Sequence, residues 1–191
     1  MFDSSLIDEY NPAAMLDDNL PLKVDPFRFA DQSLSLSGTL LVKDMSRLHS
    51  HLSSTEGKAA VDLQFGIDQE GIRYVKGHVT TGLMLACQRC LNSFKYEIIS
   101  DFLLGIVHTE KEADKLPDRY DPLLVPDLSL ILSEMIEDEL LINLPIVPMH
   151  SVDDCMAKQA FELYANDAVA EKENPFKVIE SLRHKRDGNS K

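Results

Sequence analysis

Strict alternation of apolar and polar residues predicts β-strands in the first two thirds of the chain. From Leu34 to Val42, every second position is Leu, Gly or Val, which is the pattern of a strand with one buried face. A strongly β-like region follows between residues 61 and 107 and is interrupted by the turn residues 68–71. We expect about five antiparallel strands, because short turns join them. They are predicted at 34–42, 61–67, 72–75, 78–86 and 94–99, the last leading into 101–108.

A helical period replaces the alternation near residue 128. Between 128 and 142, apolar residues recur at steps of three and four, which predicts an amphipathic helix. Asp127 offers an N-cap, and Asn143 with Pro145 ends the helix. The apolar face of this predicted helix contains Leu128, Ile131, Leu132, Met135, Ile136 and Leu140. Its opposite face contains Glu134, Glu137, Asp138 and Glu139.

Two further segments complete the expected fold. Residues 109–126 are acidic and contain three prolines, which exclude a continuous helix or a central strand. A short helix is expected at 43–52. Strands followed by a helix, without strict alternation, indicate an α+β fold in which the helix packs on an antiparallel sheet.

The chain is expected to form one domain with two tails. Residues 1–20 are acidic and lack a sustained period, so we expect a flexible leader before an α+β domain at 21–155. Residues 156–191 have a weak helical pattern and are expected to form a helical or partly flexible extension. Its basic end contains Lys177, Arg183, Lys185 and Arg186.

Composition narrows the classes of function. The 191 residues carry a formal net charge of -13, which disfavours a broad nucleic-acid-binding surface because such surfaces need Lys and Arg. A basic partner fits this charge better. Three cysteines argue against a disulfide framework and for the reducing cytosol. No secretion signal or membrane-spanning stretch is present in the sequence, so a cytoplasmic, soluble protein without a membrane partner is expected.

Cys87 and Cys90 form a Cys-x-x-Cys pair on a turn between two predicted strands. Such a pair can hold a metal, perform thiol redox chemistry or simply line a hairpin. His150 and Cys155 would supply an imidazole and a further thiolate, and Cys₃His is a known set of zinc ligands. Redox catalysis is the least favoured, because a thioredoxin-type pair opens a helix whereas a strand follows Cys90 here. Zinc binding and structural cysteines both stay open.

The charged residues admit two interpretations. The acidic face of the 128–142 helix is most simply a solvated surface opposite the core stripe, or else a surface that binds a partner. The basic residues near the carboxyl end are most simply a helix terminus, although they can contact phosphate locally. No Gly-rich phosphate loop, Gly-x-Ser-x-Gly or His-Glu-x-x-His motif is present. The sequence therefore does not indicate an enzyme or a small-molecule substrate.

Several segments together resemble the YceD family of bacterial and plastid proteins. They are the cysteine turn at 85–91, the proline-containing loop at 116–122, the helix end and following segment at 135–150, and Asn174-Pro175-Phe176. The resemblance spans most of residues 20–186. It implies a cytoplasmic role in the accumulation of large-subunit (23S) ribosomal RNA, in ribosome biogenesis. A ribosomal protein or the large-subunit precursor would be the partner, with rRNA contacted through the basic carboxyl end.

The chain departs from the family in its cysteines. Many relatives carry a second Cys-x-x-Cys after the proline-rich turn, which implies a four-sulfur metal site. Here His150 and Cys155 occupy that turn, and no further cysteine follows. Two alternatives to the ribosomal role are a zinc-stabilised interaction module and a thiol oxidoreductase that uses Cys87 and Cys90.

Overall fold

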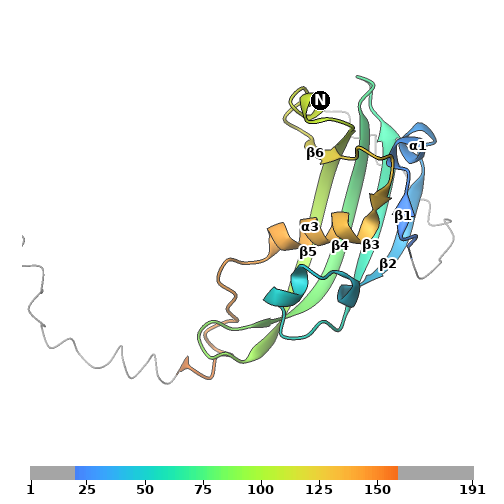
Figure 1. The fold of residues 1–191 in the computed structure, drawn as a ribbon. Helices are drawn as coiled ribbons and strands as arrows, with labels where there is room; N and C mark the ends of the chain where they lie inside the picture. Colours follow the sequence, from blue (N-terminus) through green and yellow to red (C-terminus); the bar gives the residue numbers. More distant parts are fainter. Residues whose placement is uncertain (1–19, 159–191) are drawn as a thin grey trace, which may run out of the picture. The chain divides into compact units, whose positions relative to one another are not determined.

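The computed structural model describes residues 20–158. The chain divides into two compact units, Met1–Met149 and His150–Lys191. The predicted leader and most of the predicted carboxyl-terminal extension lie outside the described residues. The elements in chain order are β1 (Lys23–Val24), α1 (Pro26–Asp31), β2 (Ser35–Leu41), the 3-10 helices η1 (Val42–Asp44) and η2 (Leu48–His51), β3 (Lys58–Ile67), β4 (Arg73–Ala86), β5 (Ser93–Val107), α2 (Glu110–Ala113), β6 (Asp121–Leu124), β7 (Leu130–Ile131) and α3 (Leu132–Asn143) (Figure 1).

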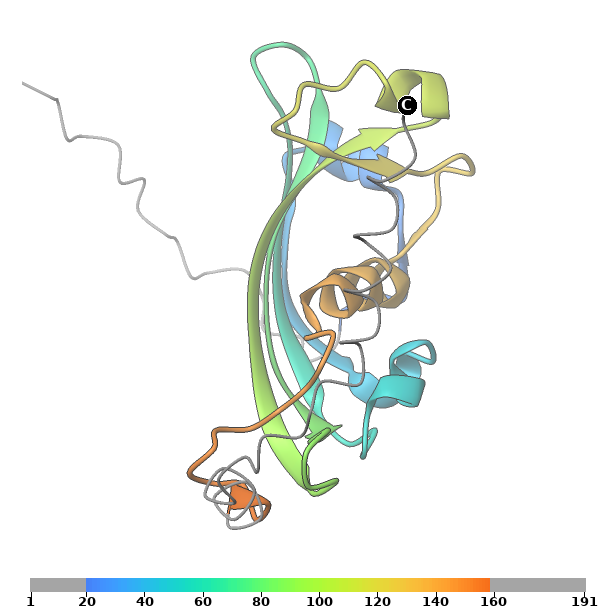
Figure 2. The ribbon, with the colours of Figure 1, turned by 90° about the vertical axis from the view of Figure 1, so that its left-hand side faces the viewer.

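The first unit is a curved five-stranded sheet in the order β2-β3-β4-β5-β6. Its helices α1, η1, η2 and α3 gather on the concave side (Figure 2). This architecture confirms the predicted α+β fold with about five strands. The predicted orientation needs one correction, because β5 and β6 pair in parallel. The chain crosses from the end of β5 through α2 before β6 begins, so β6 runs in the same direction as β5.

Strand periodicity explains the core. Alternate residues of β3 and β4, such as Val61, Leu63, Val75 and Val79, are buried under the helices, as expected for strands with one covered face. From α3, Leu132, Met135, Ile136 and Leu140 pack into the same core. These four residues belong to the apolar stripe that the helical period predicts.

The strands β4 and β5 are longer than the sequence predicts. The segments predicted at 72–75 and 78–86 form the single strand β4, and those at 94–99 and 101–108 form β5. Gly77 interrupts the apolar pattern but stays within β4, because the ring of Phe102 from β5 lies over it. A Cβ at position 77 would come within 2.0 Å of that ring.

Three helices differ from expectation. The predicted short helix at 43–52 is two 3-10 turns that bury Val42 and Leu48. Helix α3 begins at Leu132, without the expected Asp127 cap, because Leu130 and Ile131 pair with β1 instead. Helix α1 was not predicted, although Asp25 and Pro26 are a typical helix start. The Asp25 carboxylate accepts hydrogen bonds from the N–H groups of Phe27 and Arg28.

Candidate metal centre and acidic helix face

Cys87 and Cys90 lie on the tight turn that joins β4 to β5, as predicted. Cys87 donates its backbone N–H to Asn92 O at 2.9 Å, and Leu91 donates its N–H to Cys87 O at 2.8 Å. Cys87 is buried and Cys90 is half-buried. Their two Sγ atoms lie within 4.8 Å of each other. The turn thus holds both thiols close enough to ligate one ion.

Leu91 closes this turn in an unusual backbone conformation. Its φ is 62°, in the left-handed region where a residue with a Cβ is strained by about 1–2 kcal/mol. Its side chain is largely exposed, so packing does not explain the strain. The conformation is held by the two hydrogen bonds of the turn, and it directs the chain into β5 immediately after Cys90. A strand rather than a helix follows the cysteines, which does not favour the thioredoxin-type arrangement.

His150 and Cys155 lie in the described part of the second unit. The Cys155 N–H donates to Val152 O at 3.2 Å, and Lys158 N–H donates to Cys155 O at 2.9 Å. Cys155 is buried. A ring nitrogen of His150 and the Cys155 Sγ lie within 4.8 Å of each other. The predicted four-ligand set therefore consists of two pairs, one in each unit, and no disulfide joins its cysteines.

The donor types of the two pairs fit zinc. Three thiolates and one imidazole are soft or intermediate ligands that Zn²⁺ accepts in tetrahedral sites. Each pair is local in sequence, with two or four residues between its members. Buried or half-buried sulfur and nitrogen ligands are typical of structural rather than catalytic zinc. The four-ligand zinc site stays a prediction.

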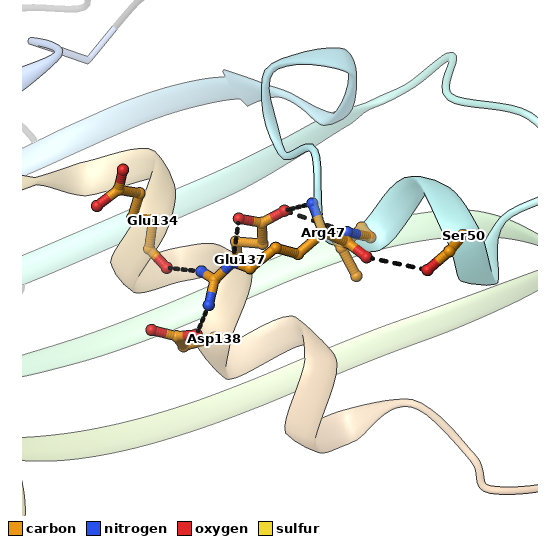
Figure 3. A network of polar contacts seen from close by, with 6 residues as sticks. Arg47, Ser50, Glu134, Glu137 and Asp138 are labelled. Carbon is orange, nitrogen blue, oxygen red and sulfur yellow. Dashed lines mark hydrogen bonds and ion pairs between the residues drawn. The ribbon is translucent and has the colours of Figure 1, made fainter.

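The acidic face of α3 is organised around Arg47, which lies between η1 and η2 (Figure 3). Arg47 Nε donates to Glu137 Oε2 at 2.8 Å, and its Nη1 binds the Asp138 carboxylate. Its Nη2 donates to the backbone oxygen of Glu134 at 3.1 Å. The hydrogen bonds that Arg47 donates, first to Glu137 and then to Asp138, raise the pKa of Arg47. One cation thus binds Glu134, Glu137 and Asp138 on one side of α3.

Glu137 differs from the solvated charge that the sequence predicts. It is 3% exposed, and its Oε1 accepts the backbone N–H groups of Arg47 and Leu48. These bonds satisfy a buried carboxylate, which would otherwise be strongly destabilising. Glu137 is therefore placed to hold the η1–η2 segment against α3, and its carboxylate is not available on the surface.

The other three acidic residues of the face stay accessible. Glu134 and Asp138 are exposed, and Glu139 is half-buried. Partial burial raises the pKa of Glu139, and the negative charges of Asp121 and Asp138 raise it further. Glu139 therefore lies in a region of excess negative potential that Arg47 does not neutralise. The predicted basic residues Lys177, Arg183, Lys185 and Arg186 lie outside the described residues.

A second polar cluster, which no local sequence pattern predicts, joins the β3–β4 turn to the loop before β6. Arg119 donates to Asp68 and Glu70 at 2.8 and 2.9 Å, and the Tyr120 hydroxyl donates to Asp68 at 2.8 Å. Partial desolvation alone would raise the pKa of Asp68, but hydrogen bonds from Ile72 N–H, Arg119 and Tyr120 outweigh it and lower this pKa from 3.8 to about 2. From the sequence, only the turn at 68–71 could be predicted, because Asp is common at the first position of a turn.

Comparison with known proteins places this arrangement in a family. The family model described as "Large ribosomal RNA subunit accumulation protein YceD" matches residues 75–183. A Haemophilus influenzae protein with the same description is 32% identical over 169 residues, which cover 87% of this chain and 97% of the relative. The chain belongs to the YceD family.

Membership of the YceD family confirms the resemblance seen in the cysteine turn and in the segment around α3. The YceD match begins within β4 and includes both ligand pairs and the acidic helix face. No solved structure gives a significant match. Within residues 20–158, no helix combines the length and the hydropathy that crossing a bilayer requires.

Proposed function

We propose that the protein is a non-enzymatic cytoplasmic factor that supports the synthesis, processing or stability of large-subunit ribosomal RNA. The observation that carries this proposal is the extent of the similarity to the Haemophilus influenzae YceD protein, which covers 87% of this chain and 97% of that relative. Because the similarity extends over nearly the whole relative, almost every part of that relative has a counterpart in this chain.

The charge distribution supports the binding of a basic protein by the first unit. The whole chain has a formal net charge of -13, and α3 presents the accessible residues Glu134, Asp138 and Glu139 without a Lys or Arg in the helix. Such a surface attracts Lys- and Arg-rich ribosomal proteins over a long range and repels phosphate. Contact with rRNA is then assigned to the basic carboxyl end, around Lys177 and Arg183–Arg186.

The polar clusters of the described residues support a role without catalysis. The Arg47–Glu137 and Asp68–Arg119 clusters each join segments that are distant in sequence. Their charged groups are occupied by bonds within the protein. Charged groups that bond to one another in this way stabilise the fold of a binding scaffold.

Zinc is the cofactor that we propose for this scaffold. Cys87 and Cys90 would supply two ligands from the first unit, and His150 and Cys155 would supply two from the second. A zinc ion held in this way would contribute folding free energy. The burial of Cys87 and Cys155 and the Cys₃His donor set support the proposal.

The test of the proposed function is depletion of the protein in its own cells. Mature large-subunit rRNA should fall relative to small-subunit rRNA, and re-expression of the wild-type chain should restore the ratio. Sequencing of rRNA ends after depletion separates a processing defect from lowered synthesis or stability. An unchanged ratio of the two rRNAs after complete depletion would contradict the proposal.

A further inference from the structure

The last turn of α3 and the segment after it expose large aliphatic side chains to solvent. Ile142 is 78% exposed, Ile146 is 100% exposed, and Val147 is 52% exposed. Burial of one such side chain stabilises a protein by roughly 1.5–3 kcal/mol. At these three positions, which lie within six residues, the side chains are largely exposed and contribute little of this free energy. We call residues 144–148 the aliphatic bridge.

The aliphatic bridge is anchored at both of its ends. Leu144 is packed against the core, and its N–H donates to Leu141 O at 3.3 Å. At the other end, Pro148 O accepts the N–H of Gln88 at 2.9 Å. Pro145 and Pro148 further restrict the backbone. Because both ends of the bridge are anchored, Ile146 and Val147 are held in exposed positions.

A pocket lies under the bridge. It measures about 270 Å³, and its lining is mixed. Leu52, Leu85 and Leu144 contribute apolar groups, whereas Ser50, His51 and Gln88 contribute polar ones. Its size accommodates an aliphatic side chain. The first unit therefore offers both exposed aliphatic groups and an adjoining recess, which is the usual form of a protein contact site.

Acidic groups precede the aliphatic residues along the same face of α3. Glu134, Asp138 and Ile142 are spaced by four residues and form one exposed stripe. Of these, Asp138 is bound by Arg47, whereas the Glu134 side chain makes no hydrogen bond or ion pair with the described residues. Glu139 lies beside the stripe and is repelled by Asp121 and Asp138. A cation brought by a partner would relieve that repulsion.

We propose that the α3 stripe and the aliphatic bridge form a docking surface for a protein segment that carries Lys or Arg next to an aliphatic anchor. Charge complementarity selects this occupant. An RNA strand would bring phosphates to acidic groups and would offer nothing to the aliphatic side chains. The inference deepens the proposed function, because it names the surface and the chemistry of the partner.

The test places a photo-crosslinking amino acid at position 146 of the full chain in cells. Ile99, which is 70% exposed on β5, is the matched control position. We expect crosslinks from position 146, and not from position 99, to a protein segment with Lys or Arg near the crosslinked residue. Crosslinks from position 146 mainly to RNA, to another copy of the chain or to its own residues 159–191 would overturn the proposal.

A binding measurement with the captured protein completes the test. Ile146→Ser should weaken the affinity by about tenfold or more, and the Glu134→Gln/Glu139→Gln pair should weaken it mainly at low salt. Ile99→Ser should leave the affinity unchanged, and thermal melting should show that each variant folds. Equal affinities of Ile146→Ser and wild type would overturn the docking surface.

Depletion distinguishes this proposal from the proposed function. A specific crosslink from position 146 with an unchanged rRNA ratio after depletion would support the docking surface and contradict the rRNA role. A lowered rRNA ratio with no basic protein crosslinked at position 146 would support the rRNA role and overturn the docking surface.

Discussion

At the scale of single residues, Glu137 shows how a cation distant in sequence allows a carboxylate to be buried. On the helix alone, it belongs to a polar face opposite the core. Arg47, which is ninety residues earlier, brings two backbone N–H groups and a guanidinium to the carboxylate. The carboxylate can then be buried, because each of its oxygens has a partner.

Removal of the Glu137 carboxylate should destabilise the fold. Glu137→Ala leaves the buried N–H of Leu48 without an acceptor and leaves Arg47 without its main partner, so we expect a loss of about 2–3 kcal/mol in the free energy of unfolding. Urea denaturation measures it. Glu134→Ala is the control, because the Glu134 backbone oxygen and not its side chain contacts Arg47. Equal stability of the two variants would show that the Glu137 contacts contribute little.

At the scale of elements, the long strands β4 and β5 are fitted to each other by a glycine. Gly77 and Phe102 are directly paired across the two strands, and the Phe102 ring occupies the space that a side chain at position 77 would need. This contact is not local in sequence. It explains why a residue that normally weakens a strand is found at its centre.

Gly77→Ala should therefore be destabilising by about 1–3 kcal/mol, since the Phe102 ring must move. Adding Phe102→Leu should recover part of this loss, because a smaller side chain leaves room for the new methyl group. A double-mutant cycle by chemical denaturation measures the coupling between the two positions. Strictly additive effects would indicate that the ring accommodates the methyl group without strain.

The β3–β4 turn should make stability depend on pH in the acid range. The pKa of Asp68 is about 2 in the folded protein and 3.8 as an ordinary value, so folding favours the ionised carboxylate. This contribution is complete above about pH 4 and is lost as the pH falls from about 4 towards 2. Melting temperatures across this range should fall more steeply for wild type than for Asp68→Asn.

Asp118→Asn is the matched control for the pH experiment. Asp118 is an exposed carboxylate in the same loop as Arg119, and it makes no hydrogen bond or ion pair with the other described residues. This variant should follow the wild-type pH profile. If Asp68→Asn also follows the wild-type profile, the Asp68 contacts do not stabilise the turn in solution.

At the scale of the whole molecule, a zinc ion bound by Cys87, Cys90, His150 and Cys155 would add to the free energy of folding. Protein purified without chelator should contain about one zinc per chain. Cys87→Ser and Cys155→Ser should each lower the zinc content and the melting temperature. Chelation should lower the melting temperature of the wild-type protein and should have little effect on these two variants. Elemental analysis and thermal melting are the measurements.

The zinc experiment has a control within the chain. His150→Ala should reduce zinc content, whereas His78→Ala, which changes a histidine of β4 that bonds to Asp101, should not. Freshly isolated wild-type protein without metal would end the zinc proposal. Folding of that metal-free protein would then identify the cysteines as structural residues of a hairpin.

The sequence by itself determined what depends on neighbours along the chain. Alternation placed β2 and β3, the helical period placed the apolar face of α3, and the spacing of Cys87 and Cys90 placed both thiols on one turn. These features follow from the two side-chain periods of strands and helices, which fix the face that a residue occupies. The resemblance to the YceD family also rested on such local segments.

Only the tertiary structure decided what depends on residues far apart. The parallel pairing of β6, the pairing of β1 with β7 and the burial of Glu137 all involve partners that no local pattern indicates. The exposure of Ile146 belongs here as well, because an apolar residue in a proline-rich segment is equally consistent with a core position. Long-range packing selects among these outcomes, since the free energy of burial depends on which surfaces meet in the fold and not on sequence spacing.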